Sequence, residues 1–341
     1  MVVIVEDITE LLKIKSEIER VYTTNEEWCL SSPSFVLSSI KNFYEEDKDF
    51  SLFFVLNKHE EQIESYLPMY IDKNKTLRFI FDTHTDYCGV IGKKVNNNFL
   101  KDFAKIIKSD NRIKRLDFEN LQLNDSLLNS LKYHLKLGTC IYASNSHSYI
   151  YSSKEKGYFS SLKTKDRSEL KRVLKKNANS AFSVFSYPQE FPYDAIVKLR
   201  DEMISDGHRT KDFLDSRFLS LIKEMYENDE LIVIANAIED KMVSVVFTFK
   251  NKTQKTFMFW ITLYNQNVQY INLASYLNFI TAVEFEDDYR IGFGRGDYAF
   301  KGTFSPKVEN LYNLRYSKSK FDFYFTNYHP IKEFIKRLVK G

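Results

Sequence analysis

Hydrophobic and polar residues follow the same pattern in two blocks of this chain. The first block is FFVLNKHEEQIESYLPMYIDKNKTLRFIFD, residues 53–82, and the second is LIVIANAIEDKMVSVVFTFKNKTQKTFMFWI, residues 231–261. Each has an apolar run, an acidic turn, a second apolar run, a Lys-Asn-Lys-Thr turn and a third apolar run. Short runs of β-branched and aromatic residues between polar turns are typical of antiparallel strands. Each block therefore predicts a three-stranded meander.

Helical patterns flank both meanders. Ahead of the second meander, apolar residues recur three and four positions apart and predict an amphipathic helix with this buried stripe: Leu214, Phe218, Leu221, Ile222 and Met225. Another helix is expected just before it, over residues 193–204. Behind each meander a further helix, 97–109 in the first half and 273–285 in the second, leads to a strand at 113–119 or 289–294.

The two halves repeat this order at a nearly constant spacing. Leu56 and Ile234 occupy the same place in their blocks and lie 178 positions apart. Shared turns, followed by the same helix and strand, indicate a duplicated α+β unit. We therefore expect two domains, residues 1–150 and 151–341, with mixed, mostly antiparallel sheets flanked by helices. The boundary is expected near residues 146–160.

Composition narrows the class of protein. The 341-residue chain is 43% apolar, which is enough for a large core, and its 49 basic and 46 acidic residues nearly cancel, so we expect no nucleic-acid partner. The first residues, MVVIVEDITELLKIK, lack the basic start of a signal peptide, and no apolar run is long enough to predict a membrane span. Three scattered cysteines, Cys29, Cys88 and Cys140, favour a reduced, cytoplasmic protein.

Four of the ten glycines gather in RIGFGRGDYAFKGTF, residues 290–304. Their G-x-G-x-G spacing differs from the G-x-G-x-x-G dinucleotide fingerprint, and the chain has no P-loop motif. A tight turn explains the glycines, but it does not explain the charged residues Arg295, Asp297 and Lys301, with Tyr298 among them. We take these four residues as candidates for a functional site.

A second concentrated signal is SLKTKDRSELKRVLKK, residues 161–176. Asp166 and Glu169 match a capping box, so we expect a helix from Arg167. Basic residues then recur every four positions on one face: Arg167, Lys171 and Lys175. A basic face at a helix start suits a phosphate or carboxylate, whereas the alternative is an ordinary solvated surface.

Two connecting segments offer further candidates. His84, Asp86 and Tyr87 come just after a predicted strand, where a loop can line a binding site. The stretch NQNVQYIN, residues 265–272, joins a strand to a helix whose free N–H groups suit a pyrophosphate, and its alternative is an ordinary loop. The six dispersed histidines have no metal-ligand spacing, so we expect no metal.

Five stretches, taken in order, resemble a known family: YLPMYI, DYCGVI, YFSSLKTKDRSELKRVLKK, LIVIANAIEDKMVSVVFTF and YRIGFGRGDYAFKGTF. They are similar to the CelD-type acetyltransferases, a double-GNAT family related to the FemAB aminoacyltransferases. That family has a "sl..k.R..l.r" segment and a closing "fDfgrGd..YK..f". The resemblance covers roughly residues 25–315, and the closing motif is its most specific part.

The resemblance implies two tandem GNAT-like acyl-CoA N-acyltransferase repeats, with the donor site in the C-terminal repeat. It implies transfer of an acetyl or other acyl group from acyl-CoA to an amine or hydroxyl. The acceptor would be a small-molecule, nucleotide-sugar, or cell-envelope or polysaccharide precursor, and acyl-CoA would be a cosubstrate, with no permanently bound cofactor. The positions that match the family's two motifs are Lys163, Arg167 and Arg172, then Arg295, Gly296, Asp297 and Lys301.

The implied reaction assigns a role to each candidate. Lys301 or Arg295 would supply fixed positive charge for the oxyanion or for an anionic acceptor, and Asp297 would orient those cations. Asp86 or His84 would act as the base. The remaining candidates are Asn265, Gln269, Asn272, Leu273 and Ala274 for the donor, and Lys163, Arg167, Arg172, His84, Tyr87 and Tyr298 for the acceptor.

The chain departs from the family pattern at three places. Gly292 stands where the family has aspartate, Phe300 stands where a tyrosine precedes the lysine, and NQNVQYINLA lacks the glycines of the Q/R-x-x-G-x-G/A pyrophosphate loop. Without glycine, backbone amides bind phosphate less freely. Three alternatives therefore stay open: a non-catalytic binder of an anionic sugar or peptide, a FemAB-like aminoacyl transferase, and an interaction protein without a small-molecule site. The sequence predicts no oligomeric state.

Overall fold

The computed structural model describes residues 1–24, 31–92, 95, 97–123, 125–136, 138–251, 255–283, 288–296, 298–304, 306–319 and 322. The chain forms two compact units. Unit 1 comprises Met1–Asn145 together with Glu309–Gly341, and unit 2 comprises Ser146–Val308. Each unit is described by itself below.

Unit 1 combines short helices with two sheets. Its helical segments are α1 (Ile8–Lys13), α2 (Lys15–Thr23), α3 (Pro33–Ser39), the π-helix η1 (Ile40–Tyr44), the 3-10 helix η2 (Asp82–His84), α4 (Asn97–Ser109) and α5 (Ser126–Leu135). Its strands are β1 (Val2–Val5), β2 (Ser51–Leu52), β3 (Phe54–His59), β4 (Gln62–Leu67), β5 (Met69–Ile71), β6 (Thr76–Phe79), β7 (Arg115–Gln122), most of β14 (Lys307–Ser317) and the first part of β8 (Thr139–Ser152).

The predicted first meander forms with one interruption. The run that we expected as its second strand is divided at Pro68 into β4, which pairs with β3, and β5, which pairs with β6. Proline lacks an N–H group and so interrupts a central strand. As a result β1-β3-β4 form one sheet, while β2-β5-β6-β7-β14-β8 follow each other in the other.

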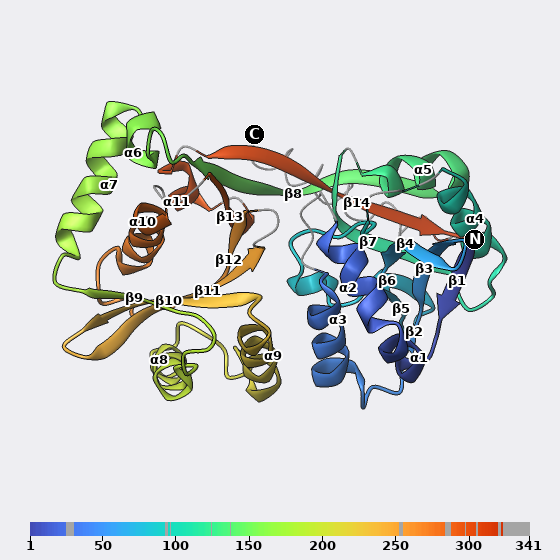
Figure 1. Ribbon diagram of the computed structural model, residues 1–341, viewed down its shortest axis with the longest axis horizontal. Helices are drawn as coiled ribbons and strands as arrows, with labels where there is room; N and C mark the ends of the chain where they lie inside the picture. Colours follow the sequence, from blue (N-terminus) through green and yellow to red (C-terminus); the bar gives the residue numbers. More distant parts are fainter. Residues whose placement is uncertain are drawn as a thin grey trace. The chain divides into compact units, whose positions relative to one another are not determined.

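Unit 2 is one mixed sheet between two layers of helices. Its helices are α6 (Tyr158–Ser161), α7 (Thr164–Lys176), α8 (Tyr193–Ser205), α9 (Ser216–Glu227), α10 (Ile271–Val283) and α11 (Ala299–Gly302). Its strands follow the order β8-β13-β12-β11-β10-β9, with β9 (Ala181–Phe185), β10 (Leu231–Ile238), β11 (Lys241–Asn251), β12 (Thr256–Tyr264) and β13 (Tyr289–Arg295). Helices α8 and α9 cover one face, and α7 and α10 cover the other (Figure 1).

The two units repeat one topology. In each, antiparallel strands lead through a helix to a parallel strand: β6, α4 and β7 in unit 1, and β12, α10 and β13 in unit 2. Each repeat also starts with an edge strand, β1 or β9, followed by helices and then by its antiparallel partner, β3 or β10. This confirms the expected α+β fold of two tandem GNAT-like repeats.

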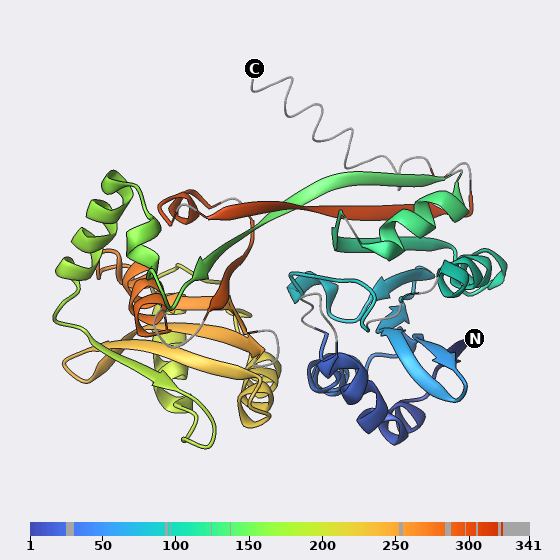
Figure 2. The same cartoon turned by 45° about the horizontal axis from the view of Figure 1, so that its top comes forward.

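The domain limits differ from the expected ones. The units divide between Asn145 and Ser146, inside the continuous strand β8 and at the edge of the region 146–160 where we expected the boundary. The C-terminal residues from Glu309 belong to unit 1, because β14 pairs antiparallel with β7 there, and Figure 2 shows β14 running beside β8. Such a long-range strand placement has no local sequence signal, so the compact units depart from the expected limits 1–150 and 151–341 at the C-terminus.

Local sequence rules account for the helices that position the site. The stripe expected between Leu214 and Met225 is buried, and α9 begins where the Asp215 carboxylate accepts from the Phe218 N–H at 2.9 Å. Helix α7 begins at Thr164, earlier than the expected Arg167. Among the helices of the described residues, none is both long and apolar enough to cross a bilayer.

Candidate functional site

The centre of unit 2 contains a pair of parallel strands that stop pairing early. Strands β12 and β13 form only three residue pairs, the last of them Met258 with Gly292. Beyond that pair β12 continues to Tyr264 and β13 to Arg295. Parallel strands that stop pairing present backbone donors and acceptors between them, which is a place where a polar chain can be bound.

A bulge in β12 lies just beyond this point. Two β11 residues, Phe247 and Thr248, face the three residues Phe259–Ile261 of β12. The additional residue reverses the alternation of side chains along the strand. Thr262 consequently meets α10, and its hydroxyl oxygen lies 2.6 Å from that of Tyr276. Burial raises the pKa of Tyr276 to about 12, so this phenol remains protonated at neutral pH.

A second bulge lies in β13, on the edge of this strand that pairs with β8. Gly292 pairs with Tyr149. The next pair is Arg295 with His147, so β13 advances by more residues than β8 does over the same interval. Gly294, inside this interval, has φ +67°. Glycine adopts this left-handed conformation without strain, which explains why the sequence concentrates glycine here.

Lys301 is tied to the backbone of this bulge. Its ammonium group donates to three consecutive carbonyl oxygens, those of Gly294 at 2.7 Å, Arg295 at 2.9 Å and Gly296 at 2.9 Å. The Gly296 N–H donates in turn to the Ser146 carbonyl at 2.8 Å. Lys301 is only 3% exposed. Because hydrogen bonds from a charged donor each contribute about 1.5–3 kcal/mol, this lysine holds the turn in one conformation.

His147 lies in the buried interior beside these groups. Its ring stacks on that of Tyr149 at an angle of 26°, with centroids 6.1 Å apart. The Arg290 guanidinium carbon is 4.0 Å from the Tyr149 centroid. Burial, together with the charges of Arg290 and Lys301, holds the pKa of His147 well below its usual range. His147 is therefore neutral at pH 7, and the surrounding field is positive.

Two cations from α7 lie at the start of α10. The Lys176 ammonium donates to the Gln269 side-chain oxygen at 2.7 Å and lies 5.2 Å from the ring centroid of Tyr270. The Arg172 guanidinium is 5.8 Å from the same centroid. Asn177 donates to the Gln269 carbonyl at 3.2 Å, which fixes the loop to α7. Positive side chains thus gather where the N–H groups of a helix terminus already favour an anion.

Unit 1 has the same pair of parallel strands, but its own chain fills the place beyond them. Pairing of β6 with β7 ends at Leu77 and Leu116. The loop after β6 then bonds to β7: the Cys88 N–H donates to the Asn120 carbonyl at 3.2 Å, and the Asn120 side chain donates to the Thr85 carbonyl at 3.1 Å. In unit 2 the connection from β12 bonds to β11 and α7 instead.

The expected acceptor residues of the basic segment have different surroundings. The Arg167 guanidinium donates to the carbonyls of Leu162, at 2.9 Å, and Ser160, at 3.2 Å, so it fixes the connection from α6 to α7. Lys163 is exposed at the N-cap position before Thr164. Of the expected set in this segment, Arg172 is the residue that reaches the start of α10.

The expected donor residues lie around the start of α10. The Asn265 side chain accepts from the Asn267 N–H at 2.9 Å, which makes a turn before the helix. Asn272 is half-buried, while Leu273 and Ala274 are buried in the core. Leu273 and Ala274 can therefore offer a ligand only their backbone, whereas Gln269 meets Lys176 as described above.

The other candidates are placed as follows. Tyr298 is 62% exposed, with its ring centroid 5.3 Å from the Lys301 nitrogen. His84 is exposed in unit 1, whereas Asp86 and Tyr87 are buried there. Asp297 lies outside the described residues, so its expected role of orienting the cations stays a prediction.

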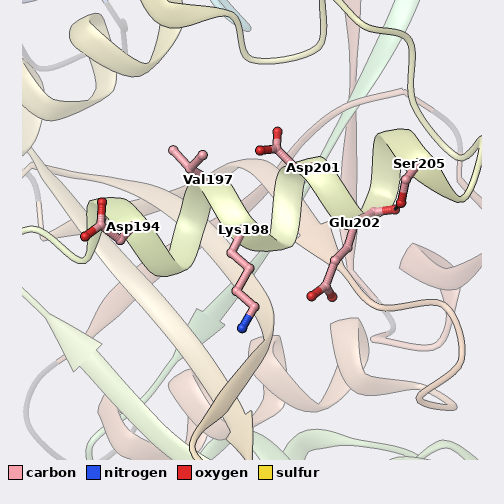
Figure 3. Close-up of a pocket in the computed structure, with 6 residues that line it drawn as sticks. All are labelled: Asp194, Val197, Lys198, Asp201, Glu202 and Ser205. Atoms are coloured by element: carbon pink, nitrogen blue, oxygen red, sulfur yellow. Dashed lines mark hydrogen bonds between the residues drawn. The ribbon is translucent and has the colours of Figure 1, made fainter.

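Two hollows among the described residues lie away from this arrangement. One, of about 540 Å³, lies along the outer face of the single helix α8 (Figure 3), and its lining residues are Asp194, Val197, Lys198, Asp201, Glu202 and Ser205. The other, of about 610 Å³, is in unit 1 and is lined by Lys114, Arg115, Ser317, Lys318, Ser319 and Asp322. Helix α8 covers the sheet face opposite α10, so its hollow is remote from the start of α10 (Figure 1).

Sequence reasoning missed several residues of the arrangement. Lys176 follows Arg172 by four positions, so helical spacing could have placed both on one face. Tyr270 lies inside the segment expected to bind the donor, but a tyrosine carries no phosphate-binding signal of its own. His147 had no local signal at all, because strand pairing alone brings it to Arg295.

Comparison with solved structures shows which proteins share this fold. The DUF2156 C-terminal domain of a protein assigned as a lysylphosphatidylglycerol synthetase in Agrobacterium fabrum has a TM-score of 0.62 at 11% identity, covering 93% of this chain and 96% of that one. FemX has a TM-score of 0.62 at 10% identity over 91% and 97% of the two chains. L-PGS from Bacillus licheniformis has a TM-score of 0.60 at 11% identity over 92% and 93%.

These identities are low, so the likeness concerns the fold. No family model matches the sequence, and no curated protein sequence matches it either. The shared fold agrees with the FemAB side of the resemblance, while the CelD-type assignment and the site residues stay predictions. The chain therefore has the fold of FemX and of the lysylphosphatidylglycerol synthetase domain.

Proposed function

We propose that this protein transfers an acyl group from acyl-CoA to an amine or hydroxyl, with the donor bound in unit 2. The observation that carries the proposal is the start of α10, where Arg172 and Lys176 gather beside a helix terminus next to the early end of β12–β13 pairing. The acceptor is a small-molecule, nucleotide-sugar, or cell-envelope or polysaccharide precursor. The cytoplasmic location expected from the sequence belongs to this proposal.

The diphosphate of the donor would bind at the start of α10. The loop there has no glycine, and Tyr270 adopts φ +64°, a conformation in which glycine is usual. Side-chain cations can supply the contacts that a glycine-rich loop makes with its backbone. Arg172 offers the planar fork that pairs with phosphate oxygens, and Lys176 adds a point charge.

The thioester end would lie between β12 and β13, beyond Met258 and Gly292. Strand N–H groups in this region can donate to the oxyanion that forms when the nucleophile attacks the thioester carbonyl. The new C–N or C–O bond then replaces the C–S bond, the acceptor loses one proton and the CoA thiolate takes one up. Asp86 and His84 stay predictions for the base.

Unit 2, and not unit 1, is the proposed donor unit. In unit 1 the corresponding space beyond the parallel pair is bridged by the chain itself, through Cys88, Asn120 and Thr85. A ligand there would have to displace buried hydrogen bonds, because Asn120 is fully buried.

A non-catalytic binder of an anionic sugar or peptide is the second candidate. The glycine-free loop with Tyr270 in a left-handed conformation favours it, because this loop offers fewer free backbone donors than a glycine-rich one. Such a protein would use the same cations without any transfer reaction.

Titration calorimetry with acetyl-CoA tests the proposal. We expect binding by the natural chain and a loss of at least about tenfold in affinity in the double variant Arg172→Ala/Lys176→Ala, because each cation contributes one or more charge-assisted hydrogen bonds. The matched control is Lys171→Ala/Lys175→Ala, which removes two exposed cations of the same helix. No binding of acetyl-CoA at millimolar concentration would overturn acyl-CoA as the donor, and binding without acyl transfer to any acceptor would favour the binder.

A further inference from the structure

The glycine bulge of β13 changes the direction of Arg295. In a regular strand Arg295 would share a face with Ile291 and Phe293, which are buried in the core that also contains α10. Because Arg295 pairs with His147, however, its side chain lies on the face of His147. The extra residue in the bulge is what moves it there.

That face is the one opposite α10. Ile150 of β8 packs into the core with α10, so its neighbours Tyr149 and Tyr151 point the other way. The stacked rings of His147 and Tyr149 share this direction. On this side of the unit 2 sheet, α8 packs on β11 and β12, and α9 packs on β10 (Figure 1).

Two other cations lie against aromatic rings of this face. The Arg290 guanidinium carbon lies 4.0 Å from the ring centroid of Tyr149, and the Lys307 nitrogen lies 4.8 Å from that of Tyr151. The faces of these two rings attract the positive charges of Arg290 and Lys307. Arg295, half-buried at the end of the strand, adds a further guanidinium. The planar fork of a guanidinium pairs with a carboxylate or phosphate.

Lys301 holds the bulge by directing its N–H donors at the backbone of the bulge. Its nitrogen donates to the carbonyls of Gly294, Arg295 and Gly296, and it is almost fully buried. An ammonium has three N–H donors, and here three carbonyls receive them. The contribution of Lys301 to a bound anion therefore passes through the backbone that carries Arg295.

We propose that Arg295 binds an anionic group of the acceptor on the sheet face opposite α10, and that Lys301 is a positioning residue that keeps the glycine bulge in shape. The inference rests on the proposed function only in naming the ligand an acceptor. The anion site itself, and the way it is built, can be tested without any transfer reaction.

The test uses orthophosphate as the probe and two readouts. Phosphate binding is followed by the NMR shift of the Arg295 side-chain nitrogen and by calorimetry, and the bulge is followed by hydrogen exchange of the Gly296 amide, which is bonded to Ser146. We expect Arg295→Gln to weaken phosphate binding by about tenfold or more with Gly296 still protected. We expect Lys301→Met to weaken binding and also to speed Gly296 exchange by about tenfold or more.

The control is Lys198→Met, which removes an exposed lysine from the outer face of α8 (Figure 3) and should change neither readout. If Lys301→Met does not fold, Gly294→Ala disturbs the same bulge without removing a charge and should also weaken phosphate binding. Loss of phosphate binding in Lys301→Met with Gly296 protection intact would show that the ammonium binds the anion directly, and unchanged binding in Arg295→Gln would remove Arg295 from the site. Either result overturns the proposal. If phosphate binds as described but no acyl transfer occurs, the proposed function fails and the anion site stands.

Discussion

The guanidinium of Arg78 on β6 lies 3.4 Å from the carboxylate of Asp82 inside unit 1. The same guanidinium donates to Asp117 of β7 at 2.8 Å, so one cation serves more than one buried acid. The Asp82 side chain is 3% exposed. Burial raises the pKa of Asp82 to about 6, since the attraction of Arg78 is offset by the neighbouring charges of Glu119 and Asp117.

This raised pKa gives unit 1 a definite dependence on pH. The folded unit binds a proton at Asp82 more tightly than the unfolded chain does, so the associated stability is present below pH 4 and is lost as the pH rises through about 6. We expect Asp82→Asn, which cannot ionise, to gain stability relative to the natural chain between pH 4 and pH 8, by on the order of 3 kcal/mol at most.

Urea unfolding at several pH values, followed by hydrogen exchange of segments 69–79 and 115–122, measures this gain. Asp102→Asn is the control, because Asp102 is exposed on α4 and its pKa is lowered by the hydrogen bond from Lys105. Stability curves of Asp82→Asn and the natural chain that stay parallel from pH 4 to pH 8 would contradict the prediction.

Unit 2 should respond to acid in the opposite sense. The pKa of His147 is lowered by burial and by Arg290 and Lys301, so below pH 6.5 the unfolded chain binds a proton that the folded unit does not. Neutral His147 therefore costs unit 2 no stability above pH 6.5. As the pH falls below 6.5, the free energy of unfolding of unit 2 decreases by about 1.4 kcal/mol for each pH unit. We call this decrease in stability below pH 6.5 the acid limb, and His147→Gln should flatten it.

Trp260 fluorescence can report unit 2, since its ring contacts Phe218 and Phe249. The measurement uses a Trp28→Phe background so that Trp260 is the single tryptophan. The control variant is His208→Gln, a half-buried histidine for which the same substitution should leave the acid limb in place. An acid limb as steep in His147→Gln as in the natural chain would show that another group causes it.

Much of the fold was predictable because it depends on local pattern. The stripe from Leu214 to Met225 and the meander that begins at Leu231 follow from side-chain periodicity, which acts over a few residues. The strand break at Pro68 also has a local cause, although we expected one unbroken strand there. The position of the C-terminal strand β14 has no such local cause, because its pairing with β7 joins residues far apart in the chain.

The candidate site divides in the same way. Glycine and charge in one window pointed to Arg295 and Lys301, and helical spacing pointed to Arg172. Strand register decides which of these side chains are buried and on which face of the sheet they lie. The pairing of Arg295 with His147 moves a side chain that strand alternation would place in the core onto the opposite face, and no window of sequence contains that information.

The difference between the units predicts one donor site in each chain. Unit 1 closes the place beyond its parallel pair with the hydrogen bonds of Asn120, whereas unit 2 has cations there from α7. Calorimetry with acetyl-CoA should therefore give a stoichiometry of one. Asn120→Ala removes the side-chain bond to Thr85 and should lower the stability of unit 1 by about 1–3 kcal/mol while leaving this stoichiometry unchanged. A stoichiometry of two in the natural chain would refute the assignment of the donor to unit 2.

Substitution of one glycine should separate the role of the bulge from that of the charges. Gly294 has φ +67°, and an alanine there would be strained by about 1–2 kcal/mol. Gly302, in the same sequence window, lies in helix α11, and a methyl group added there would enter open space, with no neighbouring atom within 4 Å. We therefore expect Gly294→Ala to lower the free energy of unfolding of unit 2 by that amount, and Gly302→Ala to change it by less than about 0.5 kcal/mol or to raise it slightly. Urea unfolding followed by Trp260 fluorescence measures both, and equal effects of the two substitutions would mean that the left-handed turn at Gly294 is not what the glycine-rich window supplies.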